Sequence, residues 1–285
     1  MKNEDYLDKL HSDILLIMDE IDRVCSENGL KYYLAGGTCI GALRHQGFIP
    51  WDDDMDIIMP YDDFKVFVSI APTALKSSFF LRWHNTEDRY HQDFAKVCLR
   101  NTLFLDSLEM SPERSGIFVD IFPVFPTRAY GMGIQIKSRV VHFLKAAIWL
   151  RASNRKVRAH QFFKFILSRV FSSKTLFKLI VWVIHPLSQS RATHYTCYAS
   201  TYPIERQVIP IDWYGDGVRL PFEGRLYMCA SESDEKMRFE YGNYMQIPPP
   251  EKRKTHCPLK VVFSDGTSLC FEQFESKVSY ADLID

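Results

Sequence analysis

Four of the five residues from Asp52 to Asp56 are aspartates, and an apolar run follows them in the segment GFIPWDDDMDIIMP. Carboxylates packed so closely repel one another, so the segment is either a solvated turn or a site that uses them. The run MDIIM predicts a strand ended by Pro60, on which Asp54 and Asp56 project to the same face. Two such carboxylates can share a divalent cation, and oxygen ligands suit Mg²⁺ or Mn²⁺. Asp52 and Asp53 fall in the preceding loop, where they could serve the metal indirectly or bind substrate.

Two further features extend this candidate site. Asp120 lies inside GIFVDIFPVF, an apolar strand in which an acid is costly unless it is paired or bound to a metal, so it is our candidate for a third carboxylate. The Gly36-Gly37 pair separates an expected strand from an expected helix, where a phosphate can approach backbone N–H groups. The order of Gly-Gly, Asp-x-Asp on a strand and Asp on a later strand resembles the nucleotidyltransferase fold, whose second strand carries the paired acids.

Hydrophobic periodicity indicates the elements that must position these residues. Residues 6–27 predict an amphipathic helix that ends at Asn28-Gly29. Strands are expected at LKYYLAGG, MDIIM, DFAKVCLRN and GIFVDIFPVF, helices at TCIGALRHQ and DDFKVFVSIAPTAL, and a closing strand pair at LKVVF and TSLCF. The alternation over the first 125 residues favours an α/β or α+β sheet domain. We expect an α+β fold with a nucleotidyltransferase-like mixed sheet flanked by helices.

The middle of the chain differs in charge from the rest. Residues 121–204 contain no Asp or Glu but thirteen Lys or Arg, in a chain whose formal net charge is zero. The segment is rich in Phe, Ile, Leu and Trp, which predicts helices, although its basic residues do not share one helical face. They either pair with the acidic remainder of the chain or lie on an anionic membrane surface, where a lipid-linked acceptor would be presented.

The sequence therefore predicts three parts. Residues 1–125 form the catalytic core, residues 126–200 form the basic helical segment that could contact a membrane or the acceptor, and residues 201–285 complete the site. With no apolar signal segment, no apolar run of about 18 residues and seven scattered cysteines without a C-x-x-C pair, we expect reduced thiols and a cytoplasmic protein. It could be peripheral on the inner face of the plasma membrane. The neutral net charge does not indicate nucleic acid as a partner, and we expect none.

The segment AGGTCIGALRHQGFIPWDDDMDIIMPYDDF, residues 35–64, strongly resembles the LicD family of phosphocholine (diphosphonucleoside choline) transferases. That family also includes fukutin-related ribitol-phosphate transferases. Three later stretches fit it as well: FAKVCLRNT, GIFVDIFPVFP, and LPFEG with YGNYMQIPPPEKRKTH. The resemblance thus runs in patches from about residue 30 to residue 257, and the first patch is the most specific.

The resemblance implies transfer of a phospho-substituent from a CDP-activated donor to a sugar hydroxyl of a cell-surface glycan, teichoic acid or glycolipid precursor. It implies that Gly36 and Gly37 contact donor phosphate through their backbone, and that Asp54 and Asp56 bind Mg²⁺ or Mn²⁺. For Asp120 the segment matches, but its role as third ligand and catalytic carboxylate is our own inference. Further substrate-binding candidates in the first patch are Thr38, Arg44, His45, Trp51, Asp52 and Asp53. The zinc-binding insert of some eukaryotic members has no counterpart here, so no structural zinc is expected.

Three candidates lie outside the first patch. Lys96 and Arg100 share one face of the strand FAKVCLR, where they bind donor phosphate or are solvated charges. His256 follows three prolines beside two basic residues, which suits a contact with phosphate or with the acceptor.

Ring-bearing residues in the same motifs allow more than one role. His45 could relay a proton or only hydrogen-bond at the end of its helix. Tyr241 and Tyr244 are expected to pack rather than to line the site.

We expect direct in-line transfer, with the metal bridging the donor diphosphate and one carboxylate, such as Asp120, accepting the proton of the acceptor hydroxyl. Two alternatives remain. A nucleotidyltransferase would attack the α-phosphate of a nucleoside triphosphate and release pyrophosphate, whereas the expected reaction releases CMP. A non-catalytic glycan- or membrane-binding protein would turn over neither donor, and the intact Asp54 and Asp56 argue against it. The donor head group (choline, ethanolamine, glycerol or ribitol) stays open.

Overall fold

The computed structural model describes residues 3–87, 90–105, 115–152, 161–184, 186–253 and 258–270. The α-helices are α1 (Asn3–Asn28), α2 (Gly36–His45), α3 (Tyr61–Ala74), α4 (Met132–Ala152), α5 (Phe162–Val170), α6 (Ser173–Ile184), α7 (Ile211–Tyr214) and α8 (Ser233–Tyr241). Short 3₁₀ helices are η3 (Gln189–Arg191), η4 (Ile204–Gln207) and η5 (Pro250–Lys252). The strands are β1 (Tyr33–Leu34), β2 (Asp56–Pro60), β3 (Phe79–Arg82), β4 (Ala95–Leu99), β5 (Leu103–Leu105), β6 (Phe118–Thr127), β7 (His194–Thr196), β8 (Val208–Pro210), β9 (Val218–Phe222), β10 (Arg225–Cys229), β11 (Lys260–Val262) and β12 (Ser268–Cys270).

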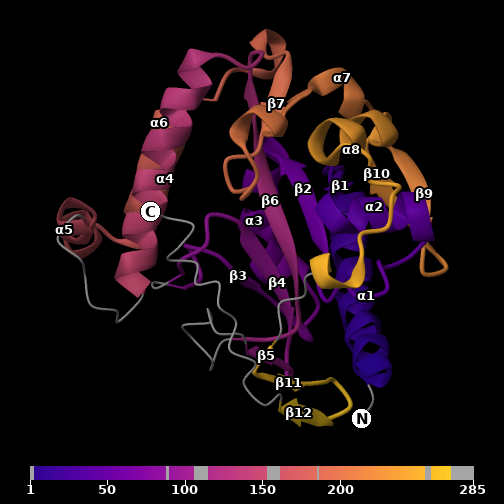
Figure 1. Ribbon diagram of the computed structural model, residues 1–285. Helices are drawn as coiled ribbons and strands as arrows, with labels where there is room; N and C mark the ends of the chain where they lie inside the picture. The colour runs from indigo at the N-terminus through magenta and orange to yellow at the C-terminus, as the bar shows by residue number, and fades with distance from the viewer. Residues whose placement is uncertain are drawn as a thin grey trace.

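The central sheet is mixed, as expected for an α+β fold. Its strand order is β1-β2-β6-β4-β3, and β7 and β8 extend it from the far end of β6. β2 and β6 run parallel, whereas β1 with β2, β4 with β6 and β3 with β4 run antiparallel. Figure 1 shows the long β6 passing through the middle of the molecule, with β2 and β4 on its two sides. The fold class is therefore confirmed, with a nucleotidyltransferase-like arrangement of strands.

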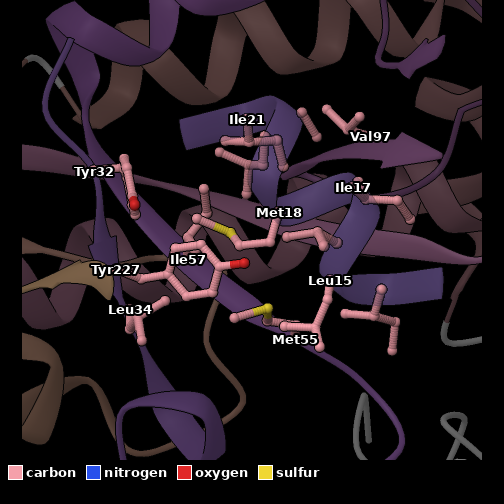
Figure 2. Close-up of a cluster of buried hydrophobic side chains, with 14 of the residues drawn as sticks. Leu15, Ile17, Met18, Ile21, Tyr32, Leu34, Met55, Ile57, Val97 and Tyr227 are labelled. Atoms are coloured by element: carbon pink, nitrogen blue, oxygen red, sulfur yellow. The ribbon is translucent and has the colours of Figure 1, made fainter. Parts of the chain in front are cut away.

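The two faces of this sheet serve different purposes because side chains alternate along each strand. Met55, Ile57 and Val97 point to one face and are fully buried against α1. Figure 2 shows these side chains packed among Leu15, Ile17, Met18 and Ile21 of α1. The intervening residues of the same strands point to the opposite face, which lines a pocket. The hydrophobic face thus anchors the strands, and the polar face is left for chemistry.

The predicted elements are largely confirmed, with two corrections near the acidic segment. The Gly36-Gly37 pair does not form a turn between strand and helix but is the first part of α2 itself. Asp54 does not lie on a strand, since β2 begins only at Asp56. β1 is short, and its register with β2 covers only Ile57 and Ile58, so this pairing does not extend to residues 52–55.

The basic middle segment forms a helical layer, as predicted. Helices α4, α5 and α6 follow β6, and the chain returns to the sheet through β7, which pairs with the end of β6. Their shared core contains Val141, Ile148, Leu176 and Ile180. In Figure 1 the three helices lie together along one side of the sheet, away from α1 and β9. None of the helices within the described ranges is both long and apolar enough to cross a membrane.

The C-terminal part returns to the first part of the chain. The predicted strand pair is confirmed as β11 and β12, and β11 also pairs with β5. Asp13 of α1 accepts a hydrogen bond from the Ser264 backbone N–H at 2.9 Å, and Lys9 pairs with Asp265 at 2.6 Å. The division into residues 1–125, 126–200 and 201–285 stays a prediction.

Candidate active site

A pocket of about 290 Å³ lies on the polar face of the sheet. Its floor is a row of charged residues on four adjacent strands. Arg82 of β3 is in register with Lys96 of β4, Lys96 with Asp120 of β6, and Asp120 with Asp56 of β2. All four line the pocket. The row therefore runs from two cations at one side to two carboxylates at the other, beside the N-terminus of α2.

The predicted carboxylates meet at the acidic side of this pocket. Asp54, Asp56 and Asp120 all line it. The Asp120 N–H donates to the Met55 carbonyl at 3.0 Å, which joins β6 to the segment between the two other acids. The Asp56 N–H donates to the hydroxyl of Thr38 at 2.9 Å. Buried Thr38 is not among the residues lining the pocket, and its hydroxyl holds the backbone of Asp56; its contact with substrate stays a prediction.

The two glycines allow the acids to approach α2 closely. Gly36 has φ +51°, and a Cβ there would lie 3.3 Å from Asp56 Oδ2. A Cβ on Gly37 would lie only 2.6 Å from Asp52 Oδ2. The Asp52 carboxylate thus lies at the positive end of the helix, where negative charge is favourable. Of the two glycines predicted to contact donor phosphate, Gly36 lines the pocket, whereas Gly37 faces Asp52.

The cationic side is held by ion pairs and aromatic rings. Lys96 Nζ lies 2.8 Å from Asp120 Oδ1 and 3.2 Å from the centroid of the Phe118 ring. Arg82 Nε lies 3.0 Å from Glu87 Oε2 in a buried pair. Little of either side chain is exposed, 12% for Lys96 and 4% for Arg82. Lys96 is therefore placed in the pocket, as predicted for a residue that binds donor phosphate.

Helix α8 supplies pocket residues that sequence reasoning missed. Lys236 Nζ lies 2.7 Å from Glu240 Oε2, and both side chains are buried. Burial acts to lower the pKa of Lys236, but the charge and the hydrogen bond of Glu240, together with the nearby cysteines, outweigh burial and raise that pKa. Tyr241, expected only to pack, also lines the pocket, 3.6 Å from a Cβ on Gly36. The i,i+4 spacing of Lys236 and Glu240 was a signal for the pair, but nothing in the sequence placed α8 beside α2.

Several predicted site residues lie elsewhere. Arg44 and His45 are at the C-terminal end of α2, where Arg44 donates to His45 at 2.9 Å and to the Tyr244 carbonyl. Burial, and then the charge of Arg44, lower the pKa of His45. Trp51 stacks under Arg253 at 4.2 Å. Arg100 donates to the Ser77 carbonyl at 3.0 Å. None of these side chains lines the pocket, and His256 lies outside the described residues.

The residues present suit a hard divalent cation. Within the described ranges, the three neighbouring acids Asp52, Asp53 and Asp54 each offer an oxygen within 4.8 Å of the others. Asp54 thus belongs both to this cluster and to the pocket that contains Asp56 and Asp120. Carboxylate oxygens are the ligands that Mg²⁺ and Mn²⁺ prefer. Asp52, Asp53 and Asp54 therefore gather closely enough for a cation site, and this trio differs from the predicted set of Asp54, Asp56 and Asp120.

A mixed sheet whose polar face brings a Gly-Gly helix start, a paired-acid segment and a later strand acid to one pocket defines a nucleotidyltransferase-type domain. The family model described as LicD/FKTN/FKRP, nucleotidyltransferase domain, matches residues 29–141. That range contains β1, α2, β2, β4 and β6, and so most of the pocket floor. Residues 29–141 therefore match the LicD family, in agreement with the resemblance of the sequence motifs.

Individual relatives agree with this assignment. The chain is 28% identical to the lipopolysaccharide cholinephosphotransferase LicD of Haemophilus influenzae over 257 residues, which cover 85% of this chain and 92% of that protein. It is 28% identical to the mouse ribitol 5-phosphate transferase FKRP over 98 residues, 34% of this chain and 17% of that protein. An uncharacterized protein of Rickettsia prowazekii is 43% identical over 83 residues, 29% of this chain and 30% of that protein. Homology of this extent supports a phosphotransferase.

Proposed function

We propose that this protein transfers a phospho-substituent, phosphocholine in the first instance, from a CDP-linked donor to a sugar hydroxyl of a cell-surface glycan or glycolipid precursor, with Mg²⁺ or Mn²⁺. The observation that carries the proposal is the register of Asp56 with Asp120 on the pocket floor, beside the start of α2. The printed activities of the bacterial LicD protein and of mouse FKRP, cholinephosphate and ribitol phosphate transfer, support the reaction type.

The residues of the pocket suit a donor diphosphate. A divalent cation, when bound, supplies the charge that neutralises the diphosphate and the departing CMP. Asp54 and Asp56 are the residues that would hold it. Lys96, fixed by Asp120 and Phe118, presents its ammonium group from the opposite side. The donor would lie between a cation held by the acids and a lysine, both of which stabilise negative charge on phosphate oxygens.

Asp120 is our candidate for the group that receives the acceptor proton. Its carboxylate lines the pocket and is 2.8 Å from the Lys96 ammonium, which stabilises the ionised form that a base requires. The acceptor hydroxyl would approach from the open side of the pocket, donate its proton to Asp120 and attack the phosphorus next to the head group. The bond from that phosphorus to the CMP oxygen breaks as the new ester forms.

The aromatic lining supports a quaternary ammonium head group. Tyr202 and Tyr241 line the pocket and meet edge to face, with ring centroids 5.0 Å apart. Phe94, Phe122 and Tyr214 add further rings to the wall. Faces of aromatic rings attract cations that cannot form hydrogen bonds. We therefore place choline ahead of ethanolamine, glycerol and ribitol as the donor head group.

A screen of CDP-linked donors, read by mass spectrometry, tests the proposal. Purified protein with Mg²⁺ and a sugar acceptor should release CMP from CDP-choline faster than from the ethanolamine, glycerol and ribitol donors. Release of pyrophosphate from a nucleoside triphosphate would identify a nucleotidyltransferase. Absence of turnover with every donor and acceptor would favour a non-catalytic binding protein.

A further inference from the structure

Helix α5 turns its apolar side chains toward solvent. Phe162, Phe163, Ile166 and Val170 are all exposed, with Phe163 at 73% and Val170 at 66%. Their spacing places them within an arc of about 100° on one face of the helix. Ser168 is the buried residue of this helix. An ordinary surface helix is built the other way round, with its apolar stripe against the core.

The neighbouring helices also carry exposed apolar residues. On α4, Met132, Ile136 and Val140 are exposed at i, i+4 and i+8, and on α6 Trp182 is 73% exposed. The helices are held together, since α4 and α6 share a core and Arg151 of α4 donates to the Ser168 carbonyl of α5 at 2.8 Å. We call the exposed apolar residues of α5, of its C-cap and of α6 the α5 face; they are Phe162, Phe163, Ile166, Val170, Phe171 and Trp182.

The segment that carries the α5 face contains basic residues and no acidic residues. Residues 121–204 contain no Asp or Glu, so no cation of the segment can pair within it. Among the described residues, one ion pair joins the segment to the rest of the chain, that of Lys145 with Asp93 at 3.1 Å. Exposed basic residues beside the face include Arg169, Lys174 and Lys178. For the described basic residues of the segment, the alternative of pairing with the acidic remainder of the chain is therefore supported at Lys145.

We propose that the α5 face binds the surface of an anionic phospholipid bilayer and lies in its interfacial region. Exposed Phe and Trp suit the boundary between headgroups and acyl chains, and Lys and Arg suit anionic headgroups. On α6, Lys174, Lys178 and Trp182 are spaced at i, i+4 and i+8. The two ammonium groups and the indole ring therefore lie on the same side of the helix. Each cation near such a surface strengthens binding by about fivefold at moderate ionic strength.

The location of this face gives it a role in the proposed function, and this step rests on that function. A second cavity, of about 510 Å³, is lined by Arg139, His142, Lys145 and Trp149 of α4 and by Lys164 of α5. It meets the active-site pocket at residues that line both, namely His91, Gln92, Ser200 and Thr201. A lipid-linked acceptor held at the bilayer surface would enter the site through this basic cavity.

Vesicle cosedimentation with the full chain tests membrane binding without any need for turnover. Binding to vesicles of phosphatidylcholine with phosphatidylglycerol should be strong at low salt, and should largely disappear at about 0.5 M salt, where the screening length is about 4 Å. Pure phosphatidylcholine vesicles should bind far less. Because neither donor nor acceptor is present, this experiment tests membrane binding independently of the proposed reaction.

Paired substitutions test whether the α5 face is the surface that binds vesicles. Phe163→Ser with Trp182→Ser should lower the partition coefficient on anionic vesicles at least about tenfold, and Lys174→Gln with Lys178→Gln should do so only at low salt. The matched controls are Leu226→Ser with Ile247→Ser, which are 56% and 52% exposed outside the segment, and Lys65→Gln with Lys252→Gln. Both controls should bind like the wild type.

Three outcomes would overturn the proposal. They are no binding to anionic vesicles at low salt, equal binding to neutral and anionic vesicles, and wild-type binding by the Phe163→Ser/Trp182→Ser variant with an unchanged melting curve. A concentration-dependent dimer that the same variant abolishes, without vesicle binding, would instead assign the face to a second copy of the chain.

Discussion

Asp56 is central to the proposed chemistry, because it lines the pocket in register with Asp120 and beside the start of α2. Its backbone is fixed by Thr38 and by Ala35, and its carboxylate lies against the start of α2. The neighbouring Asp54 reaches the same pocket from a loop. A site of this kind concentrates negative charge that a bound cation would relieve.

Replacing Asp56 by Asn should therefore affect turnover and not folding. We expect Asp56→Asn to lower CMP release at least about a hundredfold, as for other single electrostatic groups in active sites. Its melting temperature should equal or exceed that of the wild type, since carboxylate repulsion falls. Asp62→Asn, an exposed acid paired with Lys65 on α3, is the control. Near-normal turnover in both variants would remove Asp56 from the site.

Asp120 combines a structural and a proposed catalytic role, and the two are separable. Asp120→Asn should lower the melting temperature, because it leaves the nearly enclosed Lys96 ammonium without its partner at 2.8 Å. If Asp120 is also a metal ligand, the concentration of Mg²⁺ needed for half-maximal activity should be higher in Asp120→Asn than in the wild type. The control Lys96→Met breaks the same ion pair and should leave that concentration unchanged. A stability loss in Asp120→Asn with an unaltered Mg²⁺ response would restrict Asp120 to pairing with Lys96.

The space at Gly37 provides a third test at this scale. In Gly37→Ala the new Cβ would lie 2.6 Å from Asp52 Oδ2, so the carboxylate must move away from the start of α2. We expect at least about a tenfold loss of turnover with a folded protein, because small displacements of positioning groups are costly. Gly131→Ala, where the added Cβ meets nothing within 4 Å, is the matched control. Wild-type kinetics in Gly37→Ala would show that the position of Asp52 does not matter for catalysis.

At the scale of elements, an aromatic cluster joins the segment after β3 to helix α6. His84 is 4% exposed and its ring centroid lies 5.0 Å from that of Phe177 on α6 and 4.6 Å from that of Trp83. Burial, and then the charge of His91, lowers the pKa of His84 to about 3. The imidazole is therefore neutral in the folded protein at neutral pH and becomes protonated much more readily in the unfolded chain.

The pH dependence of stability follows from this difference. Between about pH 6.5 and pH 3 the unfolded chain binds a proton at His84 that the folded protein does not, so the free energy of unfolding falls as the pH falls. The contribution is at most about 1.4 kcal/mol per pH unit. In urea titrations, His84→Gln should flatten this slope, whereas the exposed His142→Gln should retain it. An equal slope in the wild type and His84→Gln would disprove the assignment.

The elements around the pocket show what could be predicted from the sequence. Alternation along β2, β4 and β6 placed Asp56, Lys96 and Asp120 on the face opposite Met55 and Val97, because strand geometry fixes which side chains share a face. The alternation of polar and apolar residues does not define where a strand begins. The prediction that Asp54 lies on the same strand as Asp56 is therefore wrong. Pairing between distant segments is not encoded locally either. The contribution of α8 and of Tyr241 to the pocket was missed for that reason.

At the scale of the whole molecule, the chain joins a LicD-family domain to a basic helical layer. The pocket forms where β2, β6 and β4 meet α2 and α8, and the layer of α4, α5 and α6 reaches the same region through the second cavity. Charge is distributed accordingly, with all acids outside residues 121–204. This separation lets one side of the molecule gather carboxylates around a cation while the other can approach an anionic surface.

The fate of the donor phosphorus tests the central claim most directly. With CDP-choline labelled at the phosphorus next to choline, Mg²⁺ and a sugar acceptor, the label should appear in the acceptor as a phosphocholine ester, and the nucleotide product should be CMP. Asp56→Asn should abolish both products together, and Asp62→Asn should abolish neither. Label retained on a nucleotide product, or an acceptor that carries cytidylate, would contradict transfer of a phospho-substituent by this pocket.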